Sequence, residues 1–230
     1  MAGTLIILLA YNEEACIADV VTELHRELPG VDVAVVDDGS RDRTSERARE
    51  AGAHVLRHPI NLGVAAAEST GLLYALRHGY SRALRMDGDG QHDPHSVPAL
   101  LEALEKGAEL VVGSRFAGMS SFRSTWLRRL GSGLISRLLS SLCRQRMTDP
   151  TSGFRGFGPR AMRYFSTHFP HDYPEPESVL MASRQRLPIV EVPVKMRARR
   201  AGQSTLTAWR STFYMAKVSF ALFMERFRAV

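Results

Sequence analysis

The chain of 230 residues is 44% hydrophobic and 23% charged, which excludes a disordered, collagen-like or coiled-coil rod protein and indicates a globular one. Its net charge of +6 conceals an asymmetry, because residues 1–114 carry 10 Lys and Arg against 18 Asp and Glu, whereas residues 115–230 carry 20 against 6. An acidic first half and a basic second half predict two electrostatic roles within one protein.

The cysteines and the apolar segments exclude several classes of protein. Cys16 and Cys143 are isolated and lack the spacing of metal ligands, as expected in a reducing cytoplasm. The apolar run at residues 5–10 is too short for the core of a signal peptide, and no segment approaches the ~20 apolar residues that span a bilayer. We therefore expect a cytoplasmic protein that is soluble or peripheral on a membrane.

Short apolar strands alternate with helices in the first half of the chain. Strands are predicted at residues 5–10, 31–36, 54–57, 81–86 and 109–112, and helices at about 12–28, 44–51, 61–79 and 94–106. This alternation with short turns predicts right-handed βαβ units, and therefore an α/β fold with a mostly parallel, Rossmann-like sheet.

The second half follows a different pattern. A helix is predicted at 122–142, a turn-rich segment at 149–158, helical pieces at 159–186, a strand at 189–194 and a last helix at 206–227. The change in composition suggests a boundary between residues 1–114 and 115–230. Since no Pro- or Ser-rich linker separates the halves, we expect one continuous domain.

Three predicted strands end in polar motifs, which begin at Ala10, Asp37 and Asp87. Ligands of open parallel sheets bind beyond the carboxyl ends of the strands, so these motifs are expected to meet at one edge. Aspartates gathered there would repel one another unless a cation lies among them. Asp87 and Asp89, separated by Gly88, can both approach one divalent ion, and oxygen ligands favour Mg²⁺ or Mn²⁺. The alternative is that these residues only form turns.

Other nucleotide and catalytic motifs are absent from the sequence. It has no G-x-G-x-x-G after the first strand, no Walker A lysine motif, no G-x-S-x-G and no H-E-x-x-H. These absences leave one interpretation, in which a metal ion bridges a nucleotide to the acidic edge of the sheet.

Eight short motifs occur in order between Ala10 and Ser204: Ala10–Glu13, Val35–Ser40, Asn61-x-Gly63, Met86–His92, Gly113–Arg115, Asp149-x-x-Ser152–Arg155, Glu191–Pro193 and Arg199-x-x-Gly202-x-Ser204. In this ordered set the chain resembles the family 2 glycosyltransferases of the GT-A fold, in the branch of dolichol-phosphate mannose synthases and related polyprenyl-phosphate glycosyltransferases.

The resemblance implies roles for the residues that match the family's motifs. Ala10, Tyr11, Glu13 and Asp37 or Asp38 would hold the nucleoside of the donor. The metal and the sugar diphosphate would lie at Asp87, Gly88, Asp89 and Gln91, with Asp87, Asp89 and Gln91 as the metal set. Phosphate contacts would come from Arg115, Arg128, Ser132 and Arg199, and Glu177 would lie near the sugar. Residues 1–114 would then be the half that binds the nucleotide sugar, and residues 115–230, with their amphipathic helices, the acceptor half.

The activity that the resemblance implies is metal-dependent, inverting glycosyl transfer. A hexose would pass from a nucleoside diphosphate sugar, of the GDP-mannose or UDP-glucose type, to a polyprenyl phosphate at the cytoplasmic face of the plasma membrane. The alternative is transfer to a hydroxyl acceptor in the biosynthesis of a polysaccharide or a small metabolite, which would need a general base such as Glu177 or Asp149. His92 is expected near the site as a polar contact.

The basic second half suggests a partner. Basic residues flank an apolar helical face made of Trp126, Leu127, Leu130, Leu134, Leu138 and Leu142, and the last helix repeats this pattern. An apolar face with basic flanks suits an anionic membrane surface, although it can also pack on the rest of the chain or in a homodimer. A nucleic acid partner is not expected, because no RNA- or DNA-binding motif is present.

Overall fold

The computed structural model describes residues 3–117, 126–168, 170 and 173–197, and for residues 126–132 the backbone alone. The strands are β1 (Thr4–Ala10), β2 (Asp32–Asp37), β3 (His54–Arg57), β4 (Arg82–Asp87), β5 (Leu110–Ser114), β6 (Arg155–Phe157) and β7 (Ile189–Pro193). The helices are α1 (Ile17–Glu27), α2 (Thr44–Glu50), α3 (Val64–Arg77), η1 (Pro94–Ser96), α4 (Val97–Glu105), α5 (Trp126–Cys143), α6 (Pro159–Phe165) and α7 (Pro174–Arg184).

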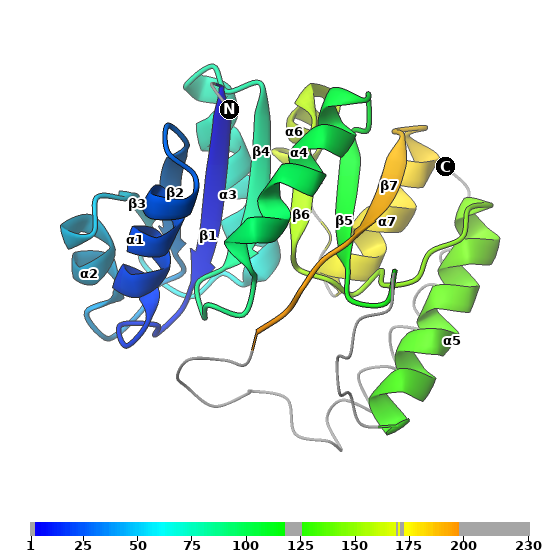
Figure 1. Ribbon diagram of the computed structural model, residues 1–230, viewed down its shortest axis with the longest axis horizontal. Coiled ribbons are helices and arrows are strands. Elements are labelled where there is room, and N and C mark those ends of the chain that lie inside the picture. Colours follow the sequence, from blue (N-terminus) through cyan, green and yellow to red (C-terminus); the bar gives the residue numbers. More distant parts are fainter. Residues whose placement is uncertain (1–2, 118–125, 169, 171–172, 198–230) are drawn as a thin grey trace.

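The described strands form one sheet in the order β3-β2-β1-β4-β6-β5-β7 (Figure 1). Every neighbouring pair is parallel except the two pairs that include β6, which is antiparallel to both β4 and β5. The predicted α/β fold with a mostly parallel sheet is therefore confirmed. Strands from both sides of residue 114 share this sheet.

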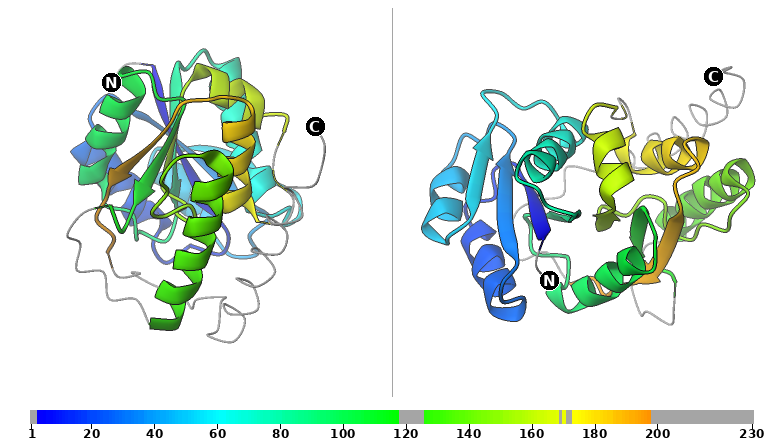
Figure 2. Two further views of the ribbon diagram at one scale, coloured as in Figure 1. Left: turned by 90° about the vertical axis from the view of Figure 1, so that its right-hand side faces the viewer. Right: turned by 90° about the horizontal axis from the view of Figure 1, so that it is seen from above.

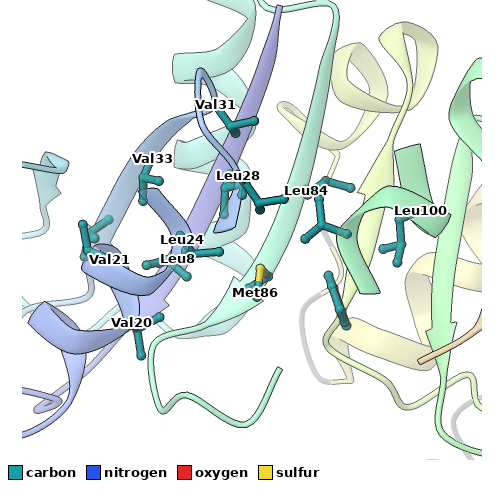
Figure 3. Packing of buried hydrophobic residues seen from close by; sticks show 14 of the residues in the cluster. Leu8, Val20, Val21, Leu24, Leu28, Val31, Val33, Leu84, Met86 and Leu100 are labelled. Atoms are coloured by element: carbon teal, nitrogen blue, oxygen red, sulfur yellow. The ribbon is translucent and has the colours of Figure 1, made fainter. Parts of the chain in front are cut away.

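Two apolar layers cover the faces of the sheet, because successive strand residues point to opposite sides. On one face Leu8, Leu84 and Met86 pack against α1 and α4, as Figure 3 shows. On the other face Leu5 and Ile7 belong to a cluster with residues of α3, α6 and α7. Figure 2, seen from above, shows the two helical layers on either side of the strands. Burial on both faces explains why β1 is a continuous apolar run.

The strand β6 contradicts the prediction of a turn-rich segment at 149–158. Its three residues, Arg155–Phe157, include a charge and a glycine and so carry no apolar run. Pairing on both sides holds it in place, since Phe157 lies opposite Ala83 of β4 and Leu110 of β5. A strand of this length is specified by its neighbours, not by its own sequence.

Helix α5 lies against α7 at its C-terminal end. Ile135 and Leu139 are fully buried there with Tyr173 and Leu180, while Leu134 stays 58% exposed. The predicted apolar face is therefore only partly on this interface, through Leu138 and Leu142, which are half-buried. The side chains of residues 126–132 and the predicted helix at 206–227 lie outside the described part.

The helices that the structure describes include none that is both long and apolar enough to span a bilayer.

Gly71 of α3 tests how tightly this helix packs on the sheet. A Cβ at this position would lie 2.4 Å from Cγ2 of Ile7, so alanine must displace a buried β1 side chain. We expect Gly71→Ala to lower the free energy of unfolding by about 1–3 kcal/mol despite the better helix propensity of alanine. Chemical denaturation measures this.

The matched control is Gly133→Ala on α5, where a Cβ would meet no atom of the described residues within 4 Å. There alanine should be neutral or should stabilise by up to about 1 kcal/mol. Equal effects of the two variants would contradict the packing described for Gly71.

Candidate active site at the carboxyl edge of the sheet

The loops that follow β1, β2 and β4 meet at one edge, as the sequence predicted. The backbone N–H of Asp38 donates to the carbonyl of Ala10 at 2.9 Å, and that of Gly88 donates to the carbonyl of Leu9 at 2.8 Å. Side chains of the β2 loop complete the connection, since the N–H of Asn12 donates to Ser40 Oγ at 2.9 Å. These bonds extend the sheet pairing into the loops and hold them side by side.

The segment between β1 and α1 is shaped by the same contacts. The N–H of Glu13 donates to Thr44 Oγ1 at 2.8 Å, and Asn12 adopts a φ of 56°. These contacts draw the chain toward the β2 loop, so α1 begins at Ile17 and not at residue 12 as predicted. Tyr11 is 44% exposed at the rim of the edge, whereas Ala10 is buried beneath it.

Asp37 and Asp38, predicted to hold the nucleoside, both make internal hydrogen bonds. Asp37 is fully buried and accepts from the N–H of Ser40 and from the hydroxyl of Ser45. Asp38 Oδ1 lies 2.8 Å from His58 Nδ1. The carboxylate of Asp38 also accepts the backbone N–H groups of Leu62 and Gly63, each at 2.8 Å. In this structure the two carboxylates stabilise the loops around β2 through hydrogen bonds.

The turn after β4 presents two carboxylates in different environments. The side chain of Asp87 is 41% exposed, whereas Asp89 is 4% exposed and its Oδ1 accepts the N–H of Gln91 at 3.0 Å. Gly88 between them packs closely on β1, because a Cβ there would lie 3.1 Å from the carbonyl oxygen of Leu9. The absence of a side chain lets the turn approach β1.

These two carboxylates fit an open metal site. In the described part of the chain, no three His, Cys, Asp or Glu side chains gather in a way that could enclose a metal ion. Two carboxylates alone leave most positions of a hard cation to other oxygens, and Mg²⁺ usually completes its shell with phosphates and water. The donor set therefore suits a cation that arrives with a diphosphate.

Glu13 and Cys16 lie beside this turn. The Cys16 thiol is 3.2 Å from Glu13 Oε2 and 3.4 Å from the carbonyl oxygen of Gly88, which places the Glu13 carboxylate next to the Asp87–Asp89 turn. The structure thus brings a residue predicted for the nucleoside close to those predicted for the metal.

His92, predicted to lie near the site as a polar contact, lies beside the turn after β4. Its Nδ1 accepts the N–H of Asp87 at 3.0 Å, and its ring stacks on Phe154 at 4.9 Å between centroids. Burial lowers the pKa of His92, which favours the neutral ring that this hydrogen bond requires.

Arg115 follows β5 and is bound to Asp149. Its guanidinium donates to both carboxylate oxygens, at 2.6 and 2.7 Å, and its backbone N–H donates a third bond at 3.0 Å. Although burial opposes the charge, the bonds and the charge of Asp149 raise the pKa of Arg115, and Asp87 and Glu175 add to this shift. Asp149 is fully buried in this pair, so it is wrongly placed for the general base considered from the sequence.

Sequence reasoning missed two buried arginines below the edge. Arg85 of β4 donates to Glu68 of α3 and to Glu175 of α7, each at 2.9 Å. Burial disfavours the charged form of Arg85, but the two glutamates raise its pKa. Arg155 of β6 donates to backbone carbonyls, including that of Glu175 at 2.5 Å, and burial lowers its pKa. For Arg85 the sequence did contain a signal, because a charged residue lies inside a predicted buried strand, two residues before Asp87.

The remaining predicted residues are described to different extents. Glu177 is half-buried in the first turn of α7, where its Oε1 accepts the N–H of Tyr173 at 3.2 Å. Arg128 and Ser132 lie on α5, but their side chains are outside the described part, as is Arg199 entirely.

The chain after β7 returns to the site. The N–H of Arg197 donates to the carbonyl of Gln91 at 2.8 Å, and its guanidinium pairs with Glu23 and Asp93 at 2.6 and 2.7 Å. The second half of the protein therefore contacts the Asp87–Gln91 loop directly.

Comparison with curated proteins identifies relatives. The chain is 34% identical to polyprenol monophosphomannose synthase of Mycolicibacterium smegmatis over 161 residues, which are 67% of this chain and 61% of that enzyme. It is 30% identical to undecaprenyl-phosphate mannosyltransferase of Micrococcus luteus, with 88% and 87% of the two chains covered. It is 31% identical to a UDP-N-acetylglucosamine–dolichyl-phosphate N-acetylglucosaminyltransferase of Methanococcus voltae, with 85% and 86% covered. The match thus spans less than two thirds of the first of these relatives.

Solved structures show the same fold. Glucosyl-3-phosphoglycerate synthase of Mycobacterium tuberculosis with phosphoglyceric acid superposes with a TM-score of 0.69 at 24% identity, covering 97% of this chain and 79% of that one. The same enzyme with Mn²⁺, UDP and glucosyl-3-phosphoglycerate gives a TM-score of 0.67. The predicted GT-A fold is therefore confirmed.

The family follows from the sequence match. Residues 5–167, which contain β1 from Leu5 onward, β2 to β6 and the loops that follow β1, β2 and β4, match Glycosyl transferase family 2. The protein is thus a glycosyltransferase enzyme that belongs to family 2.

Proposed function

We propose that the protein transfers a hexose from a nucleoside diphosphate sugar, of the GDP-mannose or UDP-glucose type, to a polyprenyl phosphate, with inversion at the anomeric carbon. The observation that supports this most directly is the pair Asp87 and Asp89 at the carboxyl edge, one exposed and one held by Gln91. Two relatives that match more than four fifths of the chain are named for their action on dolichyl phosphate and undecaprenyl phosphate.

The donor would bind across the loops of β1, β2 and β4. Tyr11 at the rim and Glu13 beside the turn after β4 would hold the nucleoside, and Asp87, Asp89 and Gln91 would hold Mg²⁺ or Mn²⁺ with the diphosphate. The cation, when bound, neutralises the charge on the departing diphosphate. The Mn²⁺ and UDP reported for glucosyl-3-phosphoglycerate synthase are compatible with this arrangement.

The transfer is a single displacement. An oxygen of the acceptor phosphate attacks the anomeric carbon, and the bond from that carbon to the diphosphate oxygen breaks, so that the nucleoside diphosphate leaves with the electron pair. Because a phosphate monoester is already ionised near pH 7, the attack needs no general base.

The acceptor phosphate would be held by basic residues of the second half. Arg115 is fixed at the end of β5 by Asp149, and Arg128 and Ser132 lie on α5, whose N-terminal end extends beyond the carboxyl edge (Figure 1). Arg199 follows the segment that Arg197 ties to the Gln91 loop. A second phosphate beside the diphosphate adds negative charge, which paired arginines offset.

The membrane assignment is also part of the proposal. The end of α5 that carries Arg128 projects on the side of the active-site loops, and Arg137 and Leu134 are exposed farther along the helix. Such a helix could place the site at the inner face of the plasma membrane, where anionic lipids attract basic side chains. Pairing of α5 with a second copy of the chain is the competing arrangement.

The metal assignment predicts loss of activity on removing either carboxylate. Asp87→Asn and Asp89→Asn should each slow transfer by at least about 100-fold, because the cation supplies several kcal/mol to the transition state. Donor consumption with Mg²⁺ or Mn²⁺ measures this. Asp19→Asn, an exposed change in the first turn of α1, is the control and should keep full activity. Wild-type activity in excess chelator would contradict the assignment.

The acceptor assignment predicts which side chain the rate of transfer depends on. With one donor and undecaprenyl phosphate, Arg128→Ala should slow transfer by about 100-fold while hydrolysis of the donor by water stays nearly unchanged, since water needs no phosphate site. Glu177→Gln should affect both rates only modestly. If Glu177→Gln alone abolishes transfer and Arg128→Ala does not, the acceptor is a hydroxyl and the polyprenyl phosphate assignment is wrong.

Membrane association predicts salt-dependent binding. The protein should sediment with anionic liposomes at low salt and be released as salt rises, because screening weakens the attraction. Replacing Arg123, Arg129 and Arg137 with Gln should weaken binding. The control replaces Arg26, Arg43 and Arg47, which are exposed on or next to α1 and α2. Equal loss in both triple variants would indicate nonspecific attraction, and no binding at all would favour an oligomer interface.

A further inference from the structure

We propose, on the basis of the function proposed above, that Arg85 is a positioning residue whose guanidinium is shared between Glu175 of α7 and Asp87 of the metal site. In this arrangement the negative charge of Glu175 keeps Arg85 from neutralising Asp87. The affinity of the donor site for a divalent cation is then set in part by a helix of the acceptor half.

The geometry of one nitrogen carries this inference. Nη2 of Arg85 lies 2.9 Å from Glu175 Oε1 and 3.6 Å from Asp87 Oδ1, so the same group faces both carboxylates, the nearer of which is Glu175. Nη1 is bound to Glu68 at 2.9 Å, which fixes the plane of the guanidinium. Arg85 cannot turn away, since its side chain is 3% exposed inside the sheet.

The surroundings of the arginine leave little freedom. Gly153 lies over the contact, and a Cβ there would be 3.0 Å from Asp87 Oδ2 and 3.2 Å from Arg85 Nη2. Within the described residues, Nε of Arg85 is one of two buried side-chain polar atoms that lack a hydrogen-bond partner. An unpaired buried donor destabilises a fold, so purely structural packing does not account well for an arginine here.

Glu175 is held in register by the neighbouring strand. Its backbone carbonyl accepts from Arg155, which lies opposite Arg85 in the β4–β6 pair and also donates to Ser178 of α7. Helix α7 in turn packs against α5, the helix that carries the proposed acceptor residues. A continuous set of contacts therefore leads from the acceptor half to Asp87.

The effect of removing the charge on Glu175 follows from electrostatics. Without it, Nη2 of Arg85 interacts with Asp87 alone, and a carboxylate paired with a guanidinium attracts a cation less strongly. The loss of one negative charge near the site acts in the same direction. Both effects lower cation affinity, and neither depends on catalysis.

The test uses Mn²⁺ as the probe, alone and with UDP or GDP, and binding is followed by loss of the free-ion electron paramagnetic resonance signal. We expect Glu175→Gln to raise the dissociation constant about tenfold, as for other partners of metal-binding side chains. Glu102→Gln is the matched control on α4, where the carboxylate is exposed and pairs only with Lys106 among the described residues. It should leave the dissociation constant unchanged. Thermal unfolding of each variant confirms that the comparison is between folded proteins.

A second comparison separates transmission through Arg85 from a general loss of charge. In an Arg85→Gln/Glu68→Gln background, which removes the buried pair together, Glu175→Gln should change the Mn²⁺ dissociation constant less than twofold. A persisting tenfold effect would overturn the role of Arg85. If this background does not fold, the same comparison is made in Arg85→Lys, whose single ammonium group cannot serve Glu68, Glu175 and Asp87 together, and the same two outcomes apply.

The outcomes distinguish this inference from the proposed function. Mn²⁺ binding by the wild type with no change in Glu175→Gln would overturn the positioning role and leave the metal site intact. A wild type that binds no Mn²⁺, alone or with UDP or GDP, would overturn the metal assignment and the positioning role with it.

Discussion

Parallel pairing of β1 with β2 on one side and β4 on the other is the constraint on which the site depends. It requires the three loops that follow these strands to leave the sheet at the same edge. The loops are then joined by backbone hydrogen bonds from Asp38 and Gly88 back to β1. Because the strands are closely packed on both faces, a shift in register would place side chains against helices that they do not fit, so the positions of the loop residues are determined by the core.

Most of the carboxylates at this edge have specific hydrogen-bond or ion-pair partners. Asp37 and Asp38 are bound by hydroxyl, imidazole and backbone donors, and Asp149 is bound by Arg115. Asp87 differs from them, since its carboxylate is the more exposed and lies next to an arginine already bound to Glu175. A group of carboxylates can thus be divided by their environments into those that support loops and those suited to a cation.

The second half of the chain completes the sheet and then returns to the loop that follows β4. The antiparallel strand β6 inserts between β4 and β5, and this places Arg155 beside Arg85 and brings α7 beneath the site. After β7 the chain passes back along Gln91 and His92. The family and the GT-A fold are thus accompanied by a structure in which the second half contacts the loop after β4 at several points.

Local patterns in the sequence were sufficient for the parallel strands, the order of the helices, the convergence of the three loops and the family. Apolar runs, turn residues and ordered motifs are short-range signals, and each of them can be interpreted without knowing what lies opposite. The strand β6, the start of α1 and the partners of Arg85, Asp38 and Asp149 depended on contacts between segments far apart in the chain. Only the tertiary structure decided these features, because a three-residue strand or a buried ion pair is stabilised by what surrounds it and leaves no periodic trace in the sequence.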